Sequence, residues 1–403
     1  MLSGRGEQAR DGSRFDYAGW VRPSRLISIS LVTLSLVLSA GSARAETAQA
    51  FAQRIATAVQ RGEGTVLDDA IDIDALLERA YRGLEVSATS KREFSSGVKK
   101  SFGFGGLISK EIQESGSYEL LRVRTVKGKQ RALFRLISPN GVNYHDMELE
   151  PARNGKDQRV VDIFIFLSGE WLSETMRRAF LPVVAHEKRV AGGPQSAYID
   201  SLPKISELST AVRNQDHARV LAIYKTLPVE VQKDRNVMLM YYQAASKAGD
   251  AEYAKALDAI QKAFPKDPAL DLLLFDDYFL KKNYDGALAA IGRVRRALGG
   301  DAYLDFLEGN IYYSKGDHEG AKVRLNRAIA AEPDLVDPYW TLITMSLEKR
   351  QWNETARLLD LVEQNAGVEL QDVGTVAEYA EFAKSKAYQT WKQRWQARQK
   401  TKN

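Results

Sequence analysis

The sequence predicts an α+β domain, in which helices pack on an antiparallel sheet, followed by an all-α helical solenoid. Apolar and polar side chains alternate between residues 117 and 168, which is the period of strands. From Ser201 onward, pairs of amphipathic helices recur at intervals of 31 to 36 residues. The chain has 403 residues, 44% hydrophobic and 27% charged, so it is long enough for two globular parts.

The first 45 residues have the features of a secretory signal peptide. Five arginines precede a 15-residue apolar run from Leu26 to Ala40, and Ala43-Arg44-Ala45 follows it. The run is too short to span a bilayer comfortably, which disfavours the alternative of an uncleaved anchor. We expect cleavage after Ala45 and a periplasmic or secreted protein, with no transmembrane segment after cleavage.

The remaining chain is nearly neutral and contains no cysteine. The leader carries six arginines and three acids, so its removal lowers the formal charge from +5 to +2. A nucleic-acid partner would need a clustered basic face, which the sequence does not indicate, so no such partner is expected. A chain without cysteine fits an oxidising compartment without depending on disulfides.

Helical periodicity precedes the predicted strands. Apolar side chains recur at three and four residues from Thr47 to Leu84, and Asp74 is expected to cap a helix there. A third helix is predicted from Lys91 to about Phe102. The Gly-Phe-Gly-Gly sequence at 103–106 lacks the pattern of a dinucleotide or phosphate loop, so it is predicted to be a turn that ends this helix.

Four strands and three glycine-containing turns are predicted next. The strands are rich in Val, Ile, Leu and Phe and span Ser117 to Val126, Gln130 to Ser138, Val142 to Glu150 and Arg159 to Ser168. The turns predict an antiparallel meander. The last strand is apolar on both faces, so it is expected to be central. A short helix from Ser173 to Phe180 follows, and Pro182 is expected to end it.

Three helices followed by a long curved antiparallel sheet resemble the nuclear-transport-factor-two-like cone fold. The resemblance rests on the order of elements over residues 47–182 and includes no diagnostic motif. It implies either a small enzyme or a binding or dimerisation module. A cystatin-like or lipid-carrier α+β domain would produce a similar pattern, so these alternatives stay open.

The helix pairs are clearest at residues 302–333, where two amphipathic helices flank a turn at Gly316. The small residues Gly309, Ala321 and Ala328 stand where the two helices must approach closely. One such hairpin cannot bury its apolar face alone, so neighbouring copies are expected.

Five copies share residue sizes at fixed offsets. An aromatic residue or histidine, which we call the marker, follows each turn at His217, Tyr253, Tyr284, His318 and Trp352. Each marker is followed by a small or β-branched residue three positions later and a large one four positions after that. The pattern resembles the tetratricopeptide repeat family, whose Gly-x-x-Tyr, Ala-x-x-x-Phe and terminal Pro offsets match Gly309/Tyr312, Ala321/Leu325 and Pro333.

These patterns set the expected organisation of the second half of the chain. A linker at 183–200 precedes five hairpins at 201–367, and a capping helix with a basic tail follows at 368–403. The main apolar side chains of the capping helix are expected to be Tyr379, Phe382, Tyr388 and Trp391.

The four histidines limit the chemistry that the sequence supports. His186-Glu187 begins like a zinc-protease helix, but Val190 stands where the second histidine should be, so no metal is expected. His217 and His318 occupy the marker position and are expected to pack between helices. No cofactor is expected.

The alternative to an adaptor is that the N-terminal α+β domain carries the activity, either as a small-molecule binder or through an acid-base site in the sheet. Tyr144, Asp146 and Asp162 stand on neighbouring predicted strands, where two acids could support a hydrolase or isomerase. His145 is expected on the opposite face, because strand neighbours point to opposite sides. The arginines that could instead pair with these acids, and so make them structural, are Arg122, Arg124 and Arg135.

The repeat resemblance implies a concave partner-binding surface. Twelve residues before each marker stands a large apolar residue, at Ile205, Tyr241, Leu272, Phe306 and Trp340. Smaller side chains follow four positions later, and those able to hydrogen-bond a partner's backbone are Asp276, Asn310 and Thr344. Such a column suits a partner's hydrophobic side chains, unless Tyr241 and Trp340 pack against neighbouring helices. We therefore expect a non-catalytic scaffold or adaptor that binds a protein or peptide partner in the cell envelope.

Overall fold

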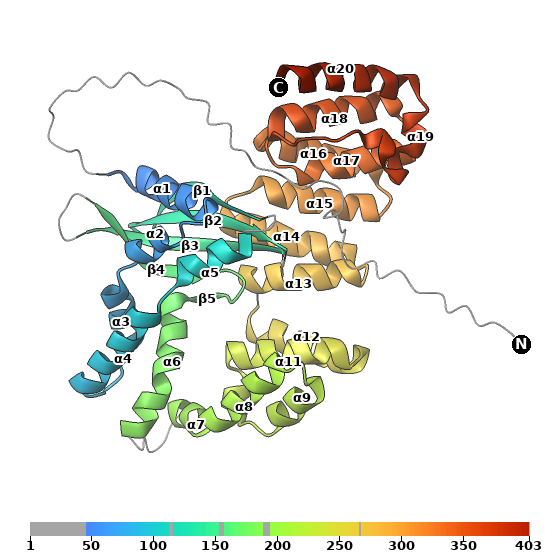
Figure 1. The fold of residues 1–403 in the computed structure, drawn as a ribbon. Coiled ribbons are helices and arrows are strands. Elements are labelled where there is room, and N and C mark those ends of the chain that lie inside the picture. The colour runs from blue at the N-terminus through green and yellow to red at the C-terminus, as the bar shows by residue number, and fades with distance from the viewer. Residues whose placement is uncertain are drawn as a thin grey trace, which may run out of the picture. The chain divides into compact units, whose positions relative to one another are not determined.

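The computed structural model describes residues 46–112, 116–139, 141–152, 157–187, 194–265 and 267–402, so the predicted signal peptide lies outside the described residues. The predicted fold class is confirmed: helices pack on a five-stranded antiparallel sheet, and helices packed in pairs follow (Figure 1). The described chain divides into two units at Leu272. We call residues 46–272 the N-terminal unit and residues 273–402 the C-terminal unit.

In the described residues before the sheet, the chain forms five helices. They are α1 (Ala48–Gln60), α2 (Thr65–Ala70), α3 (Ile73–Tyr81), α4 (Ala88–Ser101) and α5 (Phe104–Ile112). The side chain of Asp72, and not that of Asp74 as predicted, caps α3 by accepting a hydrogen bond from the Ala75 amide at 2.9 Å. Asp74 lies in the first turn of α3, where its charge is favourable to the helix dipole.

The prediction of a turn at 103–106 is wrong, because α5 begins at Phe104. The carboxylate of Asp68, on α2, accepts hydrogen bonds from the amides of Gly105 and Gly106 at 2.7 and 3.3 Å. A Cβ atom on Gly105 would lie 2.1 Å from the Gly64 carbonyl oxygen. Glycine is therefore needed for the close approach of α2 and α5, and not for a turn.

The sheet is a meander in chain order. Its strands are β1 (Ser117–Val126), β2 (Lys129–Ser138), β3 (Gly141–Pro151), β4 (Gln158–Ile165) and β5 (Glu170–Trp171). The four predicted strands are present, whereas β5 was not predicted. Lys127 and Gly128 form the first hairpin loop with φ of +50° and +79°, which matches the twist of the strands. β4 is less central than predicted, since its outer neighbour β5 has only two residues.

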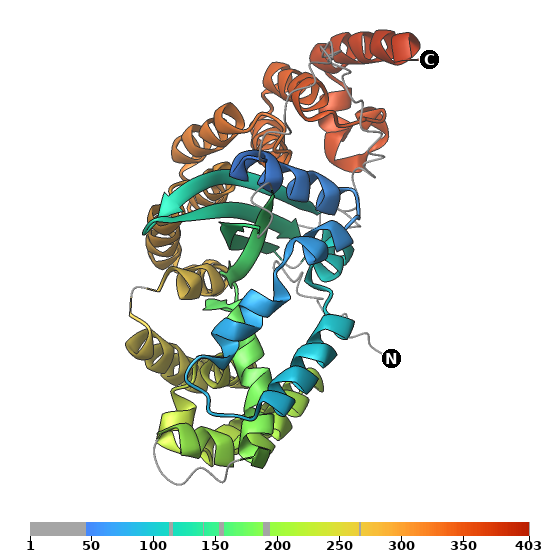
Figure 2. The same ribbon diagram turned by 90° about the vertical axis from the view of Figure 1, so that its left-hand side faces the viewer.

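One face of the sheet packs against α1 and α5 (Figure 2). The buried apolar side chains of this layer include Phe51 and Ile55 from α1, Ile108 from α5, and Phe134 and Met147 from the sheet. Side chains alternate along β3, so His145 and Met147 point into this layer. Tyr144, Asp146 and Glu148 therefore lie on the opposite face.

The helix that follows β5, α6 (Leu172–Glu187), is longer than predicted. Pro182 lies inside it and does not end it. At its last residue, Glu187 accepts hydrogen bonds from the Ser87 amide at 2.9 Å and the Ser87 hydroxyl at 2.6 Å, next to the start of α4. These bonds, with that from Ser90, lower the pKa of Glu187 to about 2. Within the predicted linker at 183–200, α7 (Pro194–Asp200) is helical, and residues 188–193 lie outside the described residues.

Helices after α7 pack in pairs within each unit. Those of the N-terminal unit are α8 (Leu202–Arg213), α9 (His217–Lys225), α10 (Val229–Gln232), α11 (Arg235–Ala248) and α12 (Asp250–Ala263). α13 (Pro268–Leu280) contains the division between the units. Those of the C-terminal unit are α14 (Tyr284–Leu298), α15 (Ala302–Ser314), α16 (His318–Ala331), α17 (Asp337–Glu348) and α18 (Trp352–Ala366).

The predicted markers locate the second helix of most pairs. His217, Tyr284, His318 and Trp352 each begin a helix, whereas Tyr253 is the fourth residue of α12. The residues predicted to fill the space between helices are all at most 9% exposed: Val220, Tyr224, Ala256, Ile260, Ala287, Ile291, Ala321, Leu325, Thr355 and Leu359. Residue size at fixed offsets thus reports how these helices pack.

Gly309 permits the close contact of α15 with α16, because a Cβ atom there would lie 2.7 Å from Cγ and Cδ2 of Leu325. We expect Gly309→Ala to lower the free energy of unfolding by about 1 to 3 kcal/mol, measured by urea denaturation. The control is Gly292→Ala in α14, where the nearest atom is Arg296 Nη1 at 3.8 Å. This variant should gain up to about 1 kcal/mol from helix propensity. Equal stability of the two variants would contradict the packing argument.

The end of the C-terminal unit is less regular than the predicted single helix. Two short 3₁₀ turns (Val373–Thr375 and Ala377–Tyr379) and α19 (Ala380–Ala383) precede α20 (Lys386–Lys402). The predicted apolar residues Tyr379, Phe382, Tyr388 and Trp391 are all buried. α20 lies on α18 (Figure 1), and its predicted solvated arginines Arg394 and Arg398 pair with Asp360 of α18 at 2.7 and 2.9 Å.

Candidate functional site

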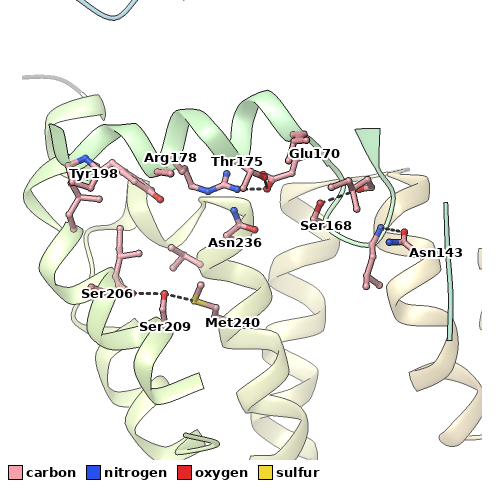
Figure 3. A pocket seen from close by; sticks show the side chains of 18 residues that line it. Asn143, Ser168, Glu170, Thr175, Arg178, Tyr198, Ser206, Ser209, Asn236 and Met240 are labelled. Atoms are coloured by element: carbon pink, nitrogen blue, oxygen red, sulfur yellow. Dashed lines mark hydrogen bonds and ion pairs between the residues drawn. The ribbon is translucent and has the colours of Figure 1, made fainter. Parts of the chain in front are cut away.

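The N-terminal unit contains a pocket of about 740 Å³ where the end of the sheet meets α6, α7, α8 and α11 (Figure 3). Most of its exposed surface is apolar, although half of the residues that line it are polar or charged. The apolar side chains that line it are Ile165, Leu167, Leu172, Ala179, Pro182, Leu202, Ile205, Val237 and Met240. A concave site with a mainly apolar surface is the usual form of a binding site.

Helical spacing explains why these side chains converge. On α8, residues 202, 205, 206 and 209 lie along one stripe, and residues 172, 175, 179 and 182 do the same on α6. Of the lining residues, only Ile205 belongs to the predicted apolar column. The stripe on α8 is visible in the sequence, but its partner stripe on α6 was hidden by the expected helix end at Pro182.

One charged group of the pocket, Arg178, is held by two neighbours. The Arg178 guanidinium pairs with the buried carboxylate of Glu170, which also accepts a hydrogen bond from Thr175 Oγ1 at 2.7 Å (Figure 3). With its amide oxygen toward Arg178, Asn236 accepts from Nε and Nη1 at 2.9 Å. Burial alone would lower the pKa of Arg178, but the hydrogen bond and charge of Glu170, together with the charge of Asp234, outweigh burial and raise this pKa. The pocket therefore carries a fixed, neutralised ion pair.

The remaining polar side chains of the pocket do not form an activated nucleophile. Burial raises the pKa of Tyr198, on α7, to about 12, so its phenol stays protonated at neutral pH. Ser209 Oγ donates to the Ile205 carbonyl at 2.9 Å and lies 3.8 Å from Met240 Sδ (Figure 3). These contacts hold Ser209 to its own helix, and the Tyr198 hydroxyl remains a neutral group of the wall.

Pro182 changes the backbone of α6 beside the pocket. Proline has no N–H, so the Arg178 carbonyl four residues earlier has no helical donor. Arg178 and Pro182 both line the pocket, so the helical hydrogen bond that proline removes lies in this part of α6.

The acids of the predicted acid-base site are held apart. In the strand register, Asp162 of β4 stands opposite Glu148, whereas Asp146 stands opposite Phe164. The Asp146 carboxylate lies 3.0 Å from Arg124 and 2.9 Å from Arg131. Tyr144, on the same face as Asp146, is buried.

Asp162 belongs to a different set of bonds. It accepts hydrogen bonds from Ser173 Oγ at 2.6 Å and the Ser173 amide at 3.1 Å, and lies 3.5 Å from Arg79. Burial outweighs these bonds and raises the pKa of Asp162. Among the expected arginine partners, Arg124 pairs with Asp146, whereas Arg135 pairs with Glu119 at 2.7 Å. This arrangement favours the structural alternative for the acids.

His145 lies on the opposite face from Asp146, as its place in the strand predicts. Its Nδ1 lies 3.2 Å from the Tyr118 hydroxyl, and its Nε2 lies 3.3 Å from the Asn143 amide nitrogen. Asn143 also lines the pocket, where its Oδ1 accepts a hydrogen bond from the Leu167 amide at 2.8 Å (Figure 3). A buried histidine thus supports one end of the pocket wall.

The predicted partner-binding residues lie in different environments. Tyr241 stacks on Tyr224 with ring centroids 4.0 Å apart, and its hydroxyl donates to Glu252 at 3.1 Å. Tyr241, Leu272 and Phe306 are each 6% exposed, so they offer little surface to a partner. This placement of Tyr241 matches the alternative that it packs against neighbouring helices.

The other predicted partner-binding residues all belong to the C-terminal unit. Trp340, Asn310 and Thr344 are partly exposed. The Asn310 side-chain oxygen accepts a hydrogen bond from Thr341 Oγ1 at 3.0 Å. The side chain of Asp276 lies outside the described residues.

The described ranges contain neither a group of metal ligands nor a helix that could span a membrane. Within the described ranges, no three His, Asp or Glu side chains are grouped so that they could hold a metal ion. No helix in that part of the chain combines the length and the apolar character needed to cross a membrane. Comparison with protein-family models, curated proteins and solved structures found no match for this chain.

Proposed function

We propose that this protein is a non-catalytic scaffold that binds a protein partner by holding an apolar segment of it in the pocket between α6, α8 and α11. The observation that carries the proposal is the apolar surface of this 740 Å³ pocket, with its charge pair already closed. Aliphatic side chains gain free energy when they leave water for such a surface. The scaffold is proposed to act in the periplasm or outside the cell after removal of residues 1–45.

The helix pairs support this proposal through their resemblance to tetratricopeptide repeats, whose hairpins hold peptides. Trp340, Asn310 and Thr344 are candidates for a second contact on the C-terminal unit, because they are partly exposed. A hydrolase or isomerase is the alternative. It is disfavoured because Asp146 and Asp162 are held in separate sets of bonds and not aimed at one another.

Blocking the pocket should abolish partner capture. Ala179 is an exposed alanine on the pocket side of α6, so Ala179→Trp should fill the pocket without disturbing the core. We expect the affinity for the partner to fall at least about tenfold, and the melting temperature to stay unchanged. The matched control is Ala222→Trp, at an exposed helical alanine of α9 outside the pocket, which should bind normally.

The partner can be identified by photocrosslinking in the cell envelope. A benzophenone side chain at Ser206, on the pocket stripe of α8, should give a protein adduct that Ala179→Trp removes. The same side chain at position 222 should give none. Equal adducts from both positions, or an adduct at 206 that survives Ala179→Trp, would count against the pocket as the binding site.

A further inference from the structure

We infer that the pocket selects uncharged aliphatic peptide segments and rejects ligands that carry a carboxylate. The inference rests on the proposed function, and it specifies the chemistry of the segment that is bound. Two features carry it: the closed ion pair of Arg178 and the apolar surface of the wall.

The ion pair leaves no cation for an acidic ligand. Arg178 is the single Lys or Arg among the described residues that line the pocket. Its guanidinium is bound by Glu170 and Asn236, and Glu170 is fixed in turn by Thr175. A ligand carboxylate would have to displace Glu170, which would then be a buried charge without its partner. Acidic peptides and fatty acids are therefore disfavoured.

The apolar part of the wall suits the aliphatic side chains of a peptide segment. Leu202, Ile205 and Val237 offer aliphatic contacts on neighbouring helices. Met240 adds a flexible side chain, which adapts to ligands of different shape. A short segment of leucine-like residues matches these apolar contacts.

The ranking of three probes by the intact mature chain tests the inference. The probes are a fluorescent acetyl-Leu-Leu-Ala-Leu-Leu-amide peptide, the same peptide with Glu at its centre, and oleate as a competitor. Fluorescence polarisation should show that the Kd of the neutral peptide is at least about tenfold lower than that of the Glu-containing peptide. Oleate should not compete with the neutral peptide. This ranking uses the wild-type protein, so it does not depend on the folding of a variant.

Glu170→Gln should change the ranking. The amide keeps an acceptor for Thr175 but removes the negative charge beside Arg178, so the Glu-containing peptide should gain about tenfold in affinity. The matched control is Glu174→Gln, at an exposed position one turn along α6, which should leave the ranking unchanged. Melting curves of both variants establish that they are folded.

The possible failures are distinguishable. If the wild-type protein binds oleate or the Glu-containing peptide as tightly as the neutral peptide, and Ala179→Trp removes that binding, the inference about charge is overturned while the pocket remains a binding site. If Ala179→Trp removes no binding of any probe, the proposed function itself is contradicted.

Discussion

Lowering the pH from 8 to 5 is expected to remove about 2 kcal/mol from the free energy of unfolding through His145 alone. Burial lowers the pKa of His145 to about 3, whereas its ordinary value is 6.5. Between these two pH values, His145 is protonated in the unfolded chain and neutral in the folded chain. Stability from this residue is therefore complete above pH 6.5 and is lost as the pH falls toward 3.

Hydrogen bonding gives the same sign as burial. The Asn143 oxygen accepts from the amides of Leu167 and Tyr144, both at 2.8 Å, so its NH₂ group must face His145 Nε2. Nε2 is then an acceptor, and the proton of the neutral ring lies on Nδ1, beside the Tyr118 hydroxyl. A second proton on Nε2 would face an NH₂ donor. The other close ring belongs to Phe104, which offers no charge to stabilise an imidazolium.

The test is urea denaturation at several pH values, with His145→Gln as the comparison. Other groups, such as Glu187 with its low pKa, contribute to acid sensitivity in both proteins. The difference between the two proteins therefore isolates the histidine. We expect the wild-type protein to lose about 2 kcal/mol more than the variant between pH 8 and pH 5. Parallel curves would show that His145 titrates normally in the folded protein.

Local signals predicted much of the fold. The Lys127-Gly128 loop determines the β1–β2 hairpin through its own backbone preference. The sizes of residues such as Ala321 and Leu325 determine how closely neighbouring helices pack. Each of these features depends on neighbours in sequence, so a pattern of residue types is enough to find it. The missed features depend on distant residues. Asp68 caps α5 across 37 positions, which no local pattern around Gly105 reveals.

The pocket was missed for the same reason. A proline normally ends a helix, but the contacts of α6 with α3 and with the end of the sheet hold it helical beyond Pro182. The acid pair was predicted from strand neighbours, yet the register places Asp162 opposite Glu148 and leaves Asp146 to two arginines. A one-residue irregularity between Glu148 and Leu149 contributes to that register and has no signature in the sequence.

Removing the Trp391 ring is expected to have the largest effect on stability in the C-terminal unit. Trp391 of α20 is fully buried in a cluster with Phe382 and Leu359, and it stacks between Tyr388 and Trp395. Trp391→Ala should therefore lower the free energy of unfolding by about 3 to 5 kcal/mol. An array of helix pairs needs a closed end, so hydrogen exchange in α18 should also rise.

Replacement by phenylalanine should cost much less, for a reason specific to this site. Within the described residues, the buried Nε1 of Trp391 has no acceptor, so Trp391→Phe removes an unsatisfied donor together with part of the ring. We expect a loss of about 1 to 2 kcal/mol in urea denaturation. Trp395→Phe is the matched comparison, because its Nε1 donates to the Leu370 carbonyl at 3.0 Å and that bond would be lost. If Trp391→Phe lowered the free energy of unfolding as much as Trp391→Ala, the indole nitrogen would have to form a hydrogen bond. In that case α20 would be held by more than apolar packing and its ion pairs.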